Sequence, residues 1–522
     1  MLKNSTFEQS RSQMIILLHS NARKFIHTSR DGKELLLESR SLVNAFWEVA
    51  EKFPEELIIW RDQDIDPIIA DNIEECFPHE LIMSSFPIVN QYIPDQIGYI
   101  DQLPFVNPNY EVVYPTWRMS TDIGGTYGKT ALRFRDTFKE ITSFGYLLNS
   151  IAKTGQQNGL FCYTNPNLTE SNQTIKLSFN STDDELFRFV AQHYKKEWLW
   201  ILLFCFWRYE KRLLLIPFLK SLGKKSFFKQ KIHLPIHEIR REKVSNESED
   251  IDVIVPTLLR SEHLRNLLVD LSKQSKLPNR VIIVEQDPDP ASVSQLEFLK
   301  EKWSFEVIHH FVHRTGACHA RNLAMKSVTA KYIFFADDDI RLETDLLEKT
   351  LAEINRLGVG CINLNCLQPG EQSVFPKIKQ WGAFGSGTSV VKSEYALKCE
   401  FSEFLEKGFG EDIDYGLQLR SKGCDIIYHP DLQFVHLKAE RGGFREVMKG
   451  QDSPEEEPKP SPTMMYLVKS AYTQIMQRGY KVSLFIKYYR KQSIKNPFRY
   501  FGSMKRRWRL SERLCEELNN AK

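Results

Sequence analysis

Residues 331–341 read KYIFFADDDIR and decide the fold class of the second half of the chain. The run YIFF is short and apolar, as in a buried strand. Three carboxylates follow directly, Asp337, Asp338 and Asp339. Because like charges repel at this spacing, we expect a positively charged group beside them. Neighbouring side chains of a strand alternate between its faces, so Asp337 and Asp339 share one side and Asp338 faces away.

The sequence around this stretch alternates between short apolar runs and amphipathic segments. DVIVP at 252–256 and RVIIVEQ at 280–286 have the pattern of strands, and NLLVDLSKQ at 266–274 has that of a helix. This alternation predicts βαβ units and a parallel sheet over residues 251–437. Ligands of such sheets bind at the carboxyl ends of the strands, so the groups that follow each strand are the first candidates for a site.

Polar residues follow all three predicted strands. Thr257 ends the first, Glu285 and Asp287 lie at the end of the second, and the aspartates end the third. Two carboxylates at positions i and i+2 suit a hard cation such as Mg²⁺ or Mn²⁺. Alternatively, Asp339 favours the N-terminal end of the next predicted helix, LETDLLEKTLAEINRL. The acidic run alone is compatible with either role.

Two nearby segments add further polar groups. In HRTGACHARNLAMKS, a helix that starts after Gly316 could place Arg321 on a phosphate. In GFGEDIDYGLQLRSKGCDIIYHPDLQFVH, Glu411 and Asp412 open a predicted helix, and His436 follows a predicted strand. Acidic residues in a first helical turn are ordinary capping partners, and a single histidine is more often a core residue than a ligand. Neither segment alone specifies a function.

The order and spacing of these segments together resemble the GT-A glycosyltransferases of family 2, which are inverting nucleotide-sugar transferases. The matching segments are VIVPT, VIIVEQD, GACHARN, FFADDD, WGAFGSGTSVV, GFGEDIDYGLQL and YHPDLQFVH, in the order of the family. Each piece alone is unspecific, but their combination between residues 250 and 437 is specific. The resemblance implies a GT-A fold, with a Rossmann-like and mostly parallel sheet, for this part of the chain.

The resemblance also implies roles for individual residues. Asp337, Asp339 and His436 look like ligands of a divalent metal, Mn²⁺ or Mg²⁺, and Asp412 looks like the general base, with Glu411 beside it. Contacts with the nucleotide sugar are implied for Pro256, Thr257, Glu285, Asp287, Gly316, Arg321, Asp337, Asp338, Gly385 and Gly387. The family usually carries Asp-Asp or Asp-Asn and then a serine after the second strand, where this chain has Glu-Gln-Asp. Which carboxylate reaches the base, and whether that base is uracil, is therefore open.

These implications lead to an expected function. The chain would be an inverting, metal-dependent enzyme that moves a sugar from a nucleoside-diphosphate sugar, with a UDP-sugar favoured. The acceptor would be a hydroxyl of a glycan or a lipid-linked molecule in surface polysaccharide synthesis. Two alternatives are a non-catalytic nucleotide-sugar or carbohydrate-binding scaffold on the same fold, and a nucleotidyltransferase. A nucleotidyltransferase would want a glycine-rich phosphate loop after the first strand, and VIVPTLLRSEHL lacks one.

Shifts in composition divide the chain into four expected regions. Residues 1–180 form an N-terminal α/β accessory domain, 181–249 a basic helical connector, and 250–440 the GT-A domain. Residues 441–522 contain an acidic, proline-rich linker and a basic helical end.

The N-terminal region contains segments similar to the second half of the chain. LIIWRDQD resembles YIFFADDD, and YPTWRMSTDIGGTYGKTAL resembles KQWGAFGSGTSVVKSEYAL. FGYLLNSIAKTGQQNGLFCYTNPNL likewise resembles EDIDYGLQLRSKGCDIIYHPDL. If Gly155 pairs with Gly423, Phe144 stands where Asp412 does, and the base is missing. The region is then either a degenerate GT-A-like module or an unrelated α/β domain, and neither predicts transferase activity.

Composition bounds the class of protein and its compartment. A net charge of +3 over 522 residues argues against a protein that coats nucleic acid. Nine cysteines without a CxxC pair or zinc-site spacing indicate reduced thiols. The N-terminal residues show no apolar core of a signal peptide. We therefore expect a cytoplasmic protein of bacterial type.

One segment leaves two interpretations open. In WLWILLFCFWRYEKRLLLIPFLK, residues 198–220, the apolar run is shorter than the roughly 18 residues of a membrane span. The segment is either a buried helix pair or an interfacial segment with its lysines and tryptophans in the headgroup zone. The basic end MKRRWRLSER is either a solvated helix or a contact with an anionic membrane. Membrane contact would make the protein peripheral on the inner face of the cell membrane.

Overall fold

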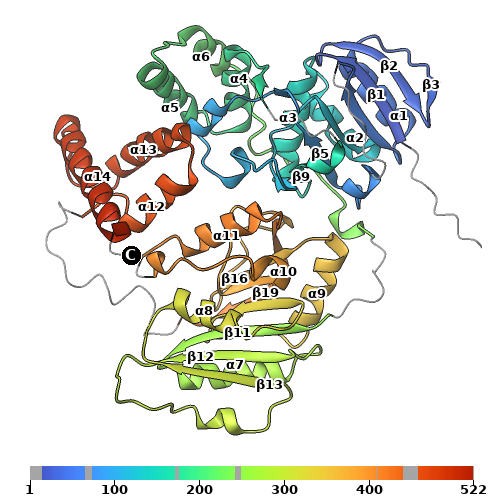
Figure 1. Ribbon diagram of the computed structural model, residues 1–522. Coiled ribbons are helices and arrows are strands. Elements are labelled where there is room, and N and C mark those ends of the chain that lie inside the picture. Colours follow the sequence, from blue (N-terminus) through green and yellow to red (C-terminus); the bar gives the residue numbers. More distant parts are fainter. Residues whose placement is uncertain are drawn as a thin grey trace, which may run out of the picture. The chain divides into compact units, whose positions relative to one another are not determined.

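The computed structural model describes residues 14–64, 73–170, 176–240, 249–406, 408–438 and 457–520. The chain divides into two compact units. Unit 1 comprises Met1–Pro94, Tyr110–Lys196 and Ile216–Ile239, and unit 2 comprises Asp95–Asn109, Glu197–Leu215 and Arg240–Lys522. Figure 1 shows the elements of both units along the chain. The first part of the predicted acidic linker, up to residue 456, lies outside the described residues.

The sheet of unit 2 has the strand order β13-β12-β11-β14-β18-β16-β19-β15, with β17 beside β19. Its parallel part consists of β11 (Ile251–Leu258), β12 (Arg280–Gln286), β13 (Glu306–Val312) and β14 (Tyr332–Ala336). The remaining strands are β15 (Ile340–Arg341), β16 (Cys361–Leu367), β17 (Lys379–Gln380), β18 (Thr388–Lys392) and β19 (Ile426–His436). β18 runs antiparallel between β14 and β16, and β19 is parallel to β16. The predicted mostly parallel sheet is confirmed.

Helices cover the sheet of unit 2 because its central strands are apolar throughout. They are α7 (Ser261–Ser272), α8 (Ala317–Met325), α9 (Leu346–Leu357), α10 (Ser393–Ala396) and α11 (Glu411–Ser421). All five residues of β14 are buried, as expected of a strand that is covered on both faces. One core cluster joins Phe335 of β14 to Ala320 of α8 and Tyr415 of α11. The strand end at Asp337 is thereby held on a rigid base.

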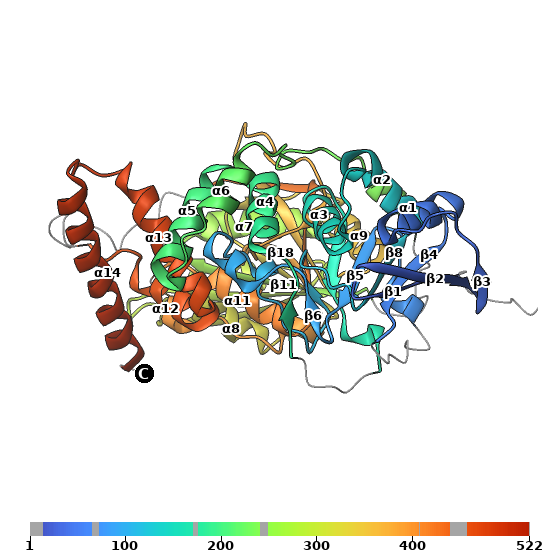
Figure 2. The same cartoon turned by 90° about the horizontal axis from the view of Figure 1, so that it is seen from above.

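Unit 2 also contains a C-terminal group of helices, which Figure 2 shows from above. They are α12 (Pro462–Ala471), α13 (Gln474–Tyr489) and α14 (Pro497–Asn520), and α5 (Glu197–Cys205) contacts α13. Met465, Phe485, Tyr500 and Trp508 form their common core. Trp508 of the basic end is therefore buried and does not contribute to the surface of α14.

The sheet of unit 1 has the order β3-β2-β1-β4-β8-β5-β9-β7. Its strands are β1 (Met14–Ser20), β2 (Lys24–Arg30), β3 (Lys33–Leu35), β4 (Leu57–Asp62), β5 (Ile82–Phe86), β7 (Tyr114–Pro115), β8 (Ile123–Tyr127) and β9 (Phe161–Thr164). β6 (Asn90–Gln91) and β10 (Ser178–Phe179) form a separate pair. The helices are α1 (Leu42–Lys52), α2 (Gly128–Phe138), α3 (Phe144–Gln156), α4 (Asp183–His193) and α6 (Leu215–Leu222). The order β1-β4-β8-β5-β9 parallels β11-β14-β18-β16-β19 of unit 2, which favours the degenerate GT-A-like module.

Two further features concern the whole described chain. All nine cysteines are free, and seven of them are buried. Among the residues that the structure describes, no helix combines the length and the apolar character needed to cross a membrane.

Candidate functional site

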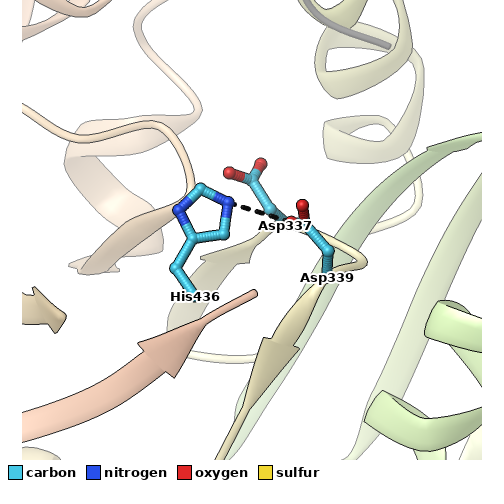
Figure 3. A group of neighbouring side chains, drawn as sticks. All are labelled: Asp337, Asp339 and His436. Carbon is cyan, nitrogen blue, oxygen red and sulfur yellow. Dashed lines mark ion pairs between the residues drawn. The ribbon is translucent and has the colours of Figure 1, made fainter. Parts of the chain in front are cut away.

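The carboxylates that follow β14 lie beside the end of β19. Asp337, Asp339 and His436 each offer one ligand atom, and these atoms lie within 4.8 Å of one another. Figure 3 shows the three side chains, with the ion pair of 3.1 Å between His436 Nε2 and Asp339 Oδ1. The backbone secures this meeting, because Ile340 of β15 pairs with His436 of β19. Asp339 and His436 lie far apart in the sequence, and their distance along the chain does not by itself show that they meet in the fold.

Asp338 faces away from this group, as the alternation of a strand predicts. It is buried, and it accepts hydrogen bonds from Thr257 Oγ1 at 2.7 Å and from Arg260 Nη1 at 2.8 Å. Burial raises the pKa of the Asp338 carboxyl, and the Arg260 guanidinium opposes that rise. Asp338 thus ties the end of β14 to the end of β11. It fixes the position of its two neighbours in the chain.

Cationic side chains surround the acidic run. Arg321 Nη2 lies 3.0 Å from Asp337 Oδ1, and Arg260 Nη1 also lies 3.6 Å from Asp339 Oδ2. The hydrogen bond with Asp339 raises the pKa of His436 to about 10. Arg260, Arg321 and His436 therefore offset part of the negative charge of the three aspartates.

The donor set fits a divalent cation. Two carboxylates and one imidazole provide oxygen and nitrogen atoms of the kind that Mn²⁺ and Mg²⁺ accept. Asp339 lies at this site, and the helix α9 has Asp345 at its N-cap position instead. The alternative role of Asp339 as a helix-capping residue is therefore wrong.

The loop before β18 passes directly over Asp337. A Cβ atom on Gly387 would lie 2.2 Å from Asp337 Oδ2, so only glycine leaves room there. Gly385 is similarly confined, because a Cβ atom would lie 2.0 Å from Thr388 Oγ1. The next residue, Ser386, donates its backbone N–H to Asp412 Oδ1 at 3.0 Å. One loop therefore connects the acidic group to the first turn of α11.

The two carboxylates at the start of α11 are both perturbed. Burial raises the pKa of Asp412, against the opposing effects of the Ser386 hydrogen bond and the charge of Arg321. Burial and the neighbouring charge of Asp412 raise the pKa of Glu411. Carboxylates with raised pKa values are suited to accepting a proton near neutral pH.

The ends of β11 and β12 form the other side of the site. Thr257 is bonded to Asp338, and Pro256 precedes it in β11. Glu285 is buried, and its Oε2 lies 2.9 Å from His309 Nε2 of β13. Asp287 is partly exposed, with Oδ1 accepting the N–H of Asp289. The two carboxylates that the sequence left as alternatives therefore have different surroundings.

The start of α8 differs from the arrangement that the sequence suggested. The N–H groups of Cys318 and His319 donate to the carboxylate of Glu406, at 3.0 and 2.9 Å. Gly316 donates its N–H to Gln286 Oε1, and a Cβ atom there would meet Glu406 at 2.4 Å. Glu406 therefore takes the helix N-terminus that a phosphate could have used. Arg321, from the second turn of α8, does reach the acidic group.

Three residues of the site were not identified from the sequence. Arg260 follows β11 after Leu259, which has a positive φ of 53°. His309 lies in the edge strand β13, and Glu406 lies in a loop far along the chain. Arg260 carried a usable signal, since it is a basic residue just after a strand end, whereas the other two depend on tertiary contacts.

Comparison with known proteins places the segment around this site in a family. Residues 252–393 match the model of the family described as Glycosyl transferase family 2. The succinoglycan biosynthesis protein ExoM of Rhizobium meliloti is 25% identical over 215 residues, which are 37% of this chain and 67% of that protein. The family match runs from β11 to β18, and it confirms the predicted family 2 resemblance over this segment.

Solved structures also show similarity to the chain. The crystal structure of S. aureus TarS 1-349 in complex with UDP-GlcNAc has a TM-score of 0.34 and 19% identity, covering 48% of this chain and 75% of that one. A crystal structure of S. aureus TarS has a TM-score of 0.33 and 16% identity over 46% of this chain, but only 43% of that chain is covered. The mannosyltransferase PcManGT from Pyrobaculum calidifontis, in complex with GDP-Man and Mn2+, has a TM-score of 0.28 and 15% identity, covering 54% and 88%. The family resemblance therefore rests on the sequence match over residues 252–393.

Proposed function

We propose that this protein is an inverting, metal-dependent glycosyltransferase that uses a nucleoside-diphosphate sugar as donor. The observation that carries the proposal is the convergence of Asp337, Asp339 and His436 at the end of β14. The two aspartates lie inside the segment that matches family 2, and His436 lies beyond its end at residue 393. ExoM is a succinoglycan biosynthesis protein, and TarS was crystallised with UDP-GlcNAc. The role of ExoM supports a place in surface polysaccharide synthesis. A UDP-sugar as donor and a hydroxyl of a glycan or lipid-linked molecule as acceptor complete the proposal.

Asp337, Asp339 and His436 would hold the metal, for which Mn²⁺ or Mg²⁺ is the choice that fits their atoms. A divalent ion bound there would neutralise the negative charge that develops on the departing diphosphate. Arg260 and Arg321, which already lie against the aspartates, would bind diphosphate oxygens as charge-assisted donors. Asp338 keeps the strand end in place throughout.

Thr257 and Glu285, at the ends of neighbouring parallel strands, would bind the nucleoside. The Glu285–His309 pair favours Glu285 as the base contact, because the histidine holds the carboxylate in one orientation. Gly385 and Gly387 would line the donor sugar with backbone, since neither has space for a side chain.

Asp412 would act as the general base, with Glu411 beside it. Its carboxylate would accept the proton of the acceptor hydroxyl while that oxygen attacks the anomeric carbon from the side opposite the diphosphate. The bond from the carbon to the diphosphate oxygen breaks as the new glycosidic bond forms, so the configuration inverts. The N–H of Ser386 orients Asp412 for this role.

An acceptor carried by a lipid would bring the enzyme to a membrane surface. α5 and the π-helical turn that follows it, Phe206–Glu210, have a surface of suitable character. Trp200, Phe204 and Trp207 are 62%, 41% and 52% exposed, and they recur at the spacing of one helical face. Arg208 and Lys211 are exposed beside them. Exposed tryptophans with nearby cations suit the headgroup zone of an anionic bilayer. Peripheral attachment to the inner face of the cell membrane is therefore part of the proposal.

The test is donor hydrolysis and transfer with purified protein, Mn²⁺ and a panel of nucleotide sugars. We expect slow release of nucleoside diphosphate that stops when EDTA removes the metal. The variant Asp339→Ala should lose metal-dependent nucleotide binding, whereas Asp412→Asn should retain binding and lose turnover. Release of pyrophosphate would indicate a nucleotidyltransferase instead, and binding without turnover in the wild type would indicate a scaffold.

A further inference from the structure

Six strands of the sheet of unit 1 repeat six strands of the sheet of unit 2. β1, β4, β8, β5 and β9 have the spatial order of β11, β14, β18, β16 and β19, and each neighbouring pair runs in the same relative direction. β7 lies antiparallel beside β9, as β17 lies beside β19. The strands also follow one another along the chain in the same sequence. Shared order and direction across six strands indicate the same fold.

Residues that pair across the strands fix a single alignment between the two units. The equivalent residues are Met14 and Ile251, Leu57 and Tyr332, Tyr127 and Lys392, Met83 and Cys361, Cys162 and Ile426, and Tyr114 and Lys379. With these equivalences, each neighbouring pair of the six strands has the same register in both units. Because a shift of one residue would turn every side chain to the other face, agreement of the register argues for a true second copy.

The alignment places Asp62 at the position of Asp337 and Asp64 at that of Asp339. Asp62 is 3% exposed, and its Oδ2 lies 3.5 Å from His19 Nδ1. It also accepts the backbone N–H groups of Asn21 at 2.8 Å and Asp64 at 3.1 Å. Unit 1 keeps the spacing of the two aspartates. The carboxylate of Asp62, however, already binds groups of its own unit.

The general base has no counterpart in the second copy. Gly159 and Gly423 both have positive φ, 104° and 85°. They lie three residues before Cys162 and Ile426, which are equivalent in the two sheets. This equivalence places Leu148, which is fully buried, at Asp412. The pairing of Gly155 with Gly423 assumed from the sequence is therefore wrong, and so is the position given to Phe144.

The loop over the first aspartate has also changed. Asp122 occupies the position of Gly387. Its Oδ2 accepts the backbone N–H groups of Ile88, Val89 and Asn90, at 2.6 to 2.8 Å. A carboxylate used in this way organises the local backbone, and it puts a negative charge where a sugar diphosphate would have to approach.

The nucleoside side of the fold is missing from the part of unit 1 that the structure describes. In unit 2, α7 separates β11 from β12, and β11, β12 and β13 run parallel. In unit 1, only residues 21–23 separate β1 from β2, and β1, β2 and β3 form antiparallel hairpins. The strand ends that present Thr257 and Glu285 in unit 2 therefore have no equivalent pair in unit 1.

From these differences we infer that unit 1 is a second GT-A module that has lost its donor site, so that the chain binds one nucleotide and not two. The inference rests on the proposed donor site of unit 2. Its support is the retained register together with the engaged Asp62, the apolar Leu148, the charged Asp122 and the absent nucleoside half. Unit 1 then serves the enzyme as a non-transferring module.

Isothermal titration of the full chain with UDP in the presence of Mn²⁺ tests the inference, with variants at equivalent positions. We expect one UDP per chain, at least tenfold weaker binding in Asp339→Ala, and unchanged binding in the matched variant Asp64→Ala, whose side chain is exposed. The variant Asp62→Asn should lower the melting temperature while leaving UDP affinity and turnover unchanged.

The possible results distinguish the inference about unit 1 from the proposed function of the whole protein. Two UDP molecules per chain, or binding in Asp339→Ala that disappears when Asp64→Ala is added, would overturn the second-copy inference and leave the proposed function intact. If the wild type bound neither UDP nor any other nucleoside diphosphate of the donor panel, the proposed function would be overturned, and with it the inference, which rests on the donor site of unit 2. Loss of affinity in Asp64→Ala, with its melting temperature unchanged, would also show that unit 1 contributes to the donor site.

Discussion

At the scale of single residues, the geometry of the site depends on positions where neither an extra side-chain atom nor the loss of a hydrogen bond can be accommodated. Gly387 is the clearest case, because Asp337 fills the space that a side chain would need. Asp412 is another, because burial and one backbone hydrogen bond set both its charge and its orientation. Changes of a few atoms at these positions should therefore alter binding or turnover separately.

The variant Gly387→Ala should weaken metal-dependent nucleotide binding by about tenfold to a hundredfold, as is typical when a group that supports metal ligands is disturbed. The added Cβ would displace the Asp337 carboxylate. Titration with UDP and Mn²⁺ measures the effect. A matched control is Gly502→Ala in α14, where the nearest atom lies 3.9 Å from the new Cβ. Equal affinities in the two variants would contradict the role given to Gly387.

Turnover should fall as the pH drops through the pKa of Asp412. Burial raises this pKa, which means that the neutral form is favoured more than in water, while only the charged form can accept a proton. The acid limb of the kcat profile should therefore have its midpoint above 3.8, the ordinary value for aspartate. The profile is measured by transfer to a hydroxyl acceptor over the range in which circular dichroism is unchanged. A rate that stays flat to pH 4 would rule out Asp412 as the base.

At the scale of elements, the strongly apolar segments could be predicted and the edge segments could not. RVIIVEQ forms β12 over the predicted residues, and YIFFA forms β14. YEVVYP, at residues 110–115, has the composition of a short strand. Only Tyr114–Pro115 of this segment pair with a neighbouring strand. Pro115 lacks the N–H that a longer ladder would use, and the strand lies at the sheet edge.

The same scale explains which part of the site was predictable. Asp337, Asp339, Asp412 and His436 lie at strand and helix ends that the periodicity already marks. His309 and Glu406 act through contacts between distant segments, which no local pattern encodes. The glycine pairing in unit 1 failed for a related reason: Gly155 lies within α3, whereas Gly159 has the positive φ that ends a helix.

The exposed face formed by α5 and the turn Phe206–Glu210 should bind anionic vesicles. In sedimentation assays, the wild type should bind vesicles of phosphatidylcholine with phosphatidylglycerol better than phosphatidylcholine alone. The double variant Trp200→Ser with Trp207→Ser should bind at least tenfold more weakly, because two interfacial anchors are lost. Leu36→Ser is the matched control, since Leu36 is exposed in unit 1, outside this face. Equal binding by the double variant and the control would contradict the membrane role.

At the scale of the whole molecule, two units with separate sheets and cores share one chain. Within the described ranges of the chain, the acidic group and the strand ends for a nucleoside lie in unit 2 alone. A ligand that binds the native form stabilises it by about 2.7 kcal/mol at a hundredfold excess over Kd. Binding of UDP with Mn²⁺ should therefore stabilise unit 2 and leave the stability of unit 1 unchanged.

Calorimetry should show two unfolding transitions, of which UDP with Mn²⁺ raises one. Limited proteolysis during heating identifies the unit that is stabilised, and we expect it to be unit 2. The variant Asp339→Ala should lose the shift without a change in the other transition. A shift of both transitions together would instead show that the two units unfold as one cooperative body.

The buried thiols have a practical consequence. Burial raises the pKa of Cys205 to about 12 and that of Cys399 to about 11. Because the thiolate is the reactive form, maleimides will modify these side chains slowly at neutral pH. Cys366 is partly exposed and would be the native cysteine to replace first. A nitroxide attached through Trp207→Cys would then report its depth in a bilayer by power-saturation spectroscopy, with the other eight cysteines left in place.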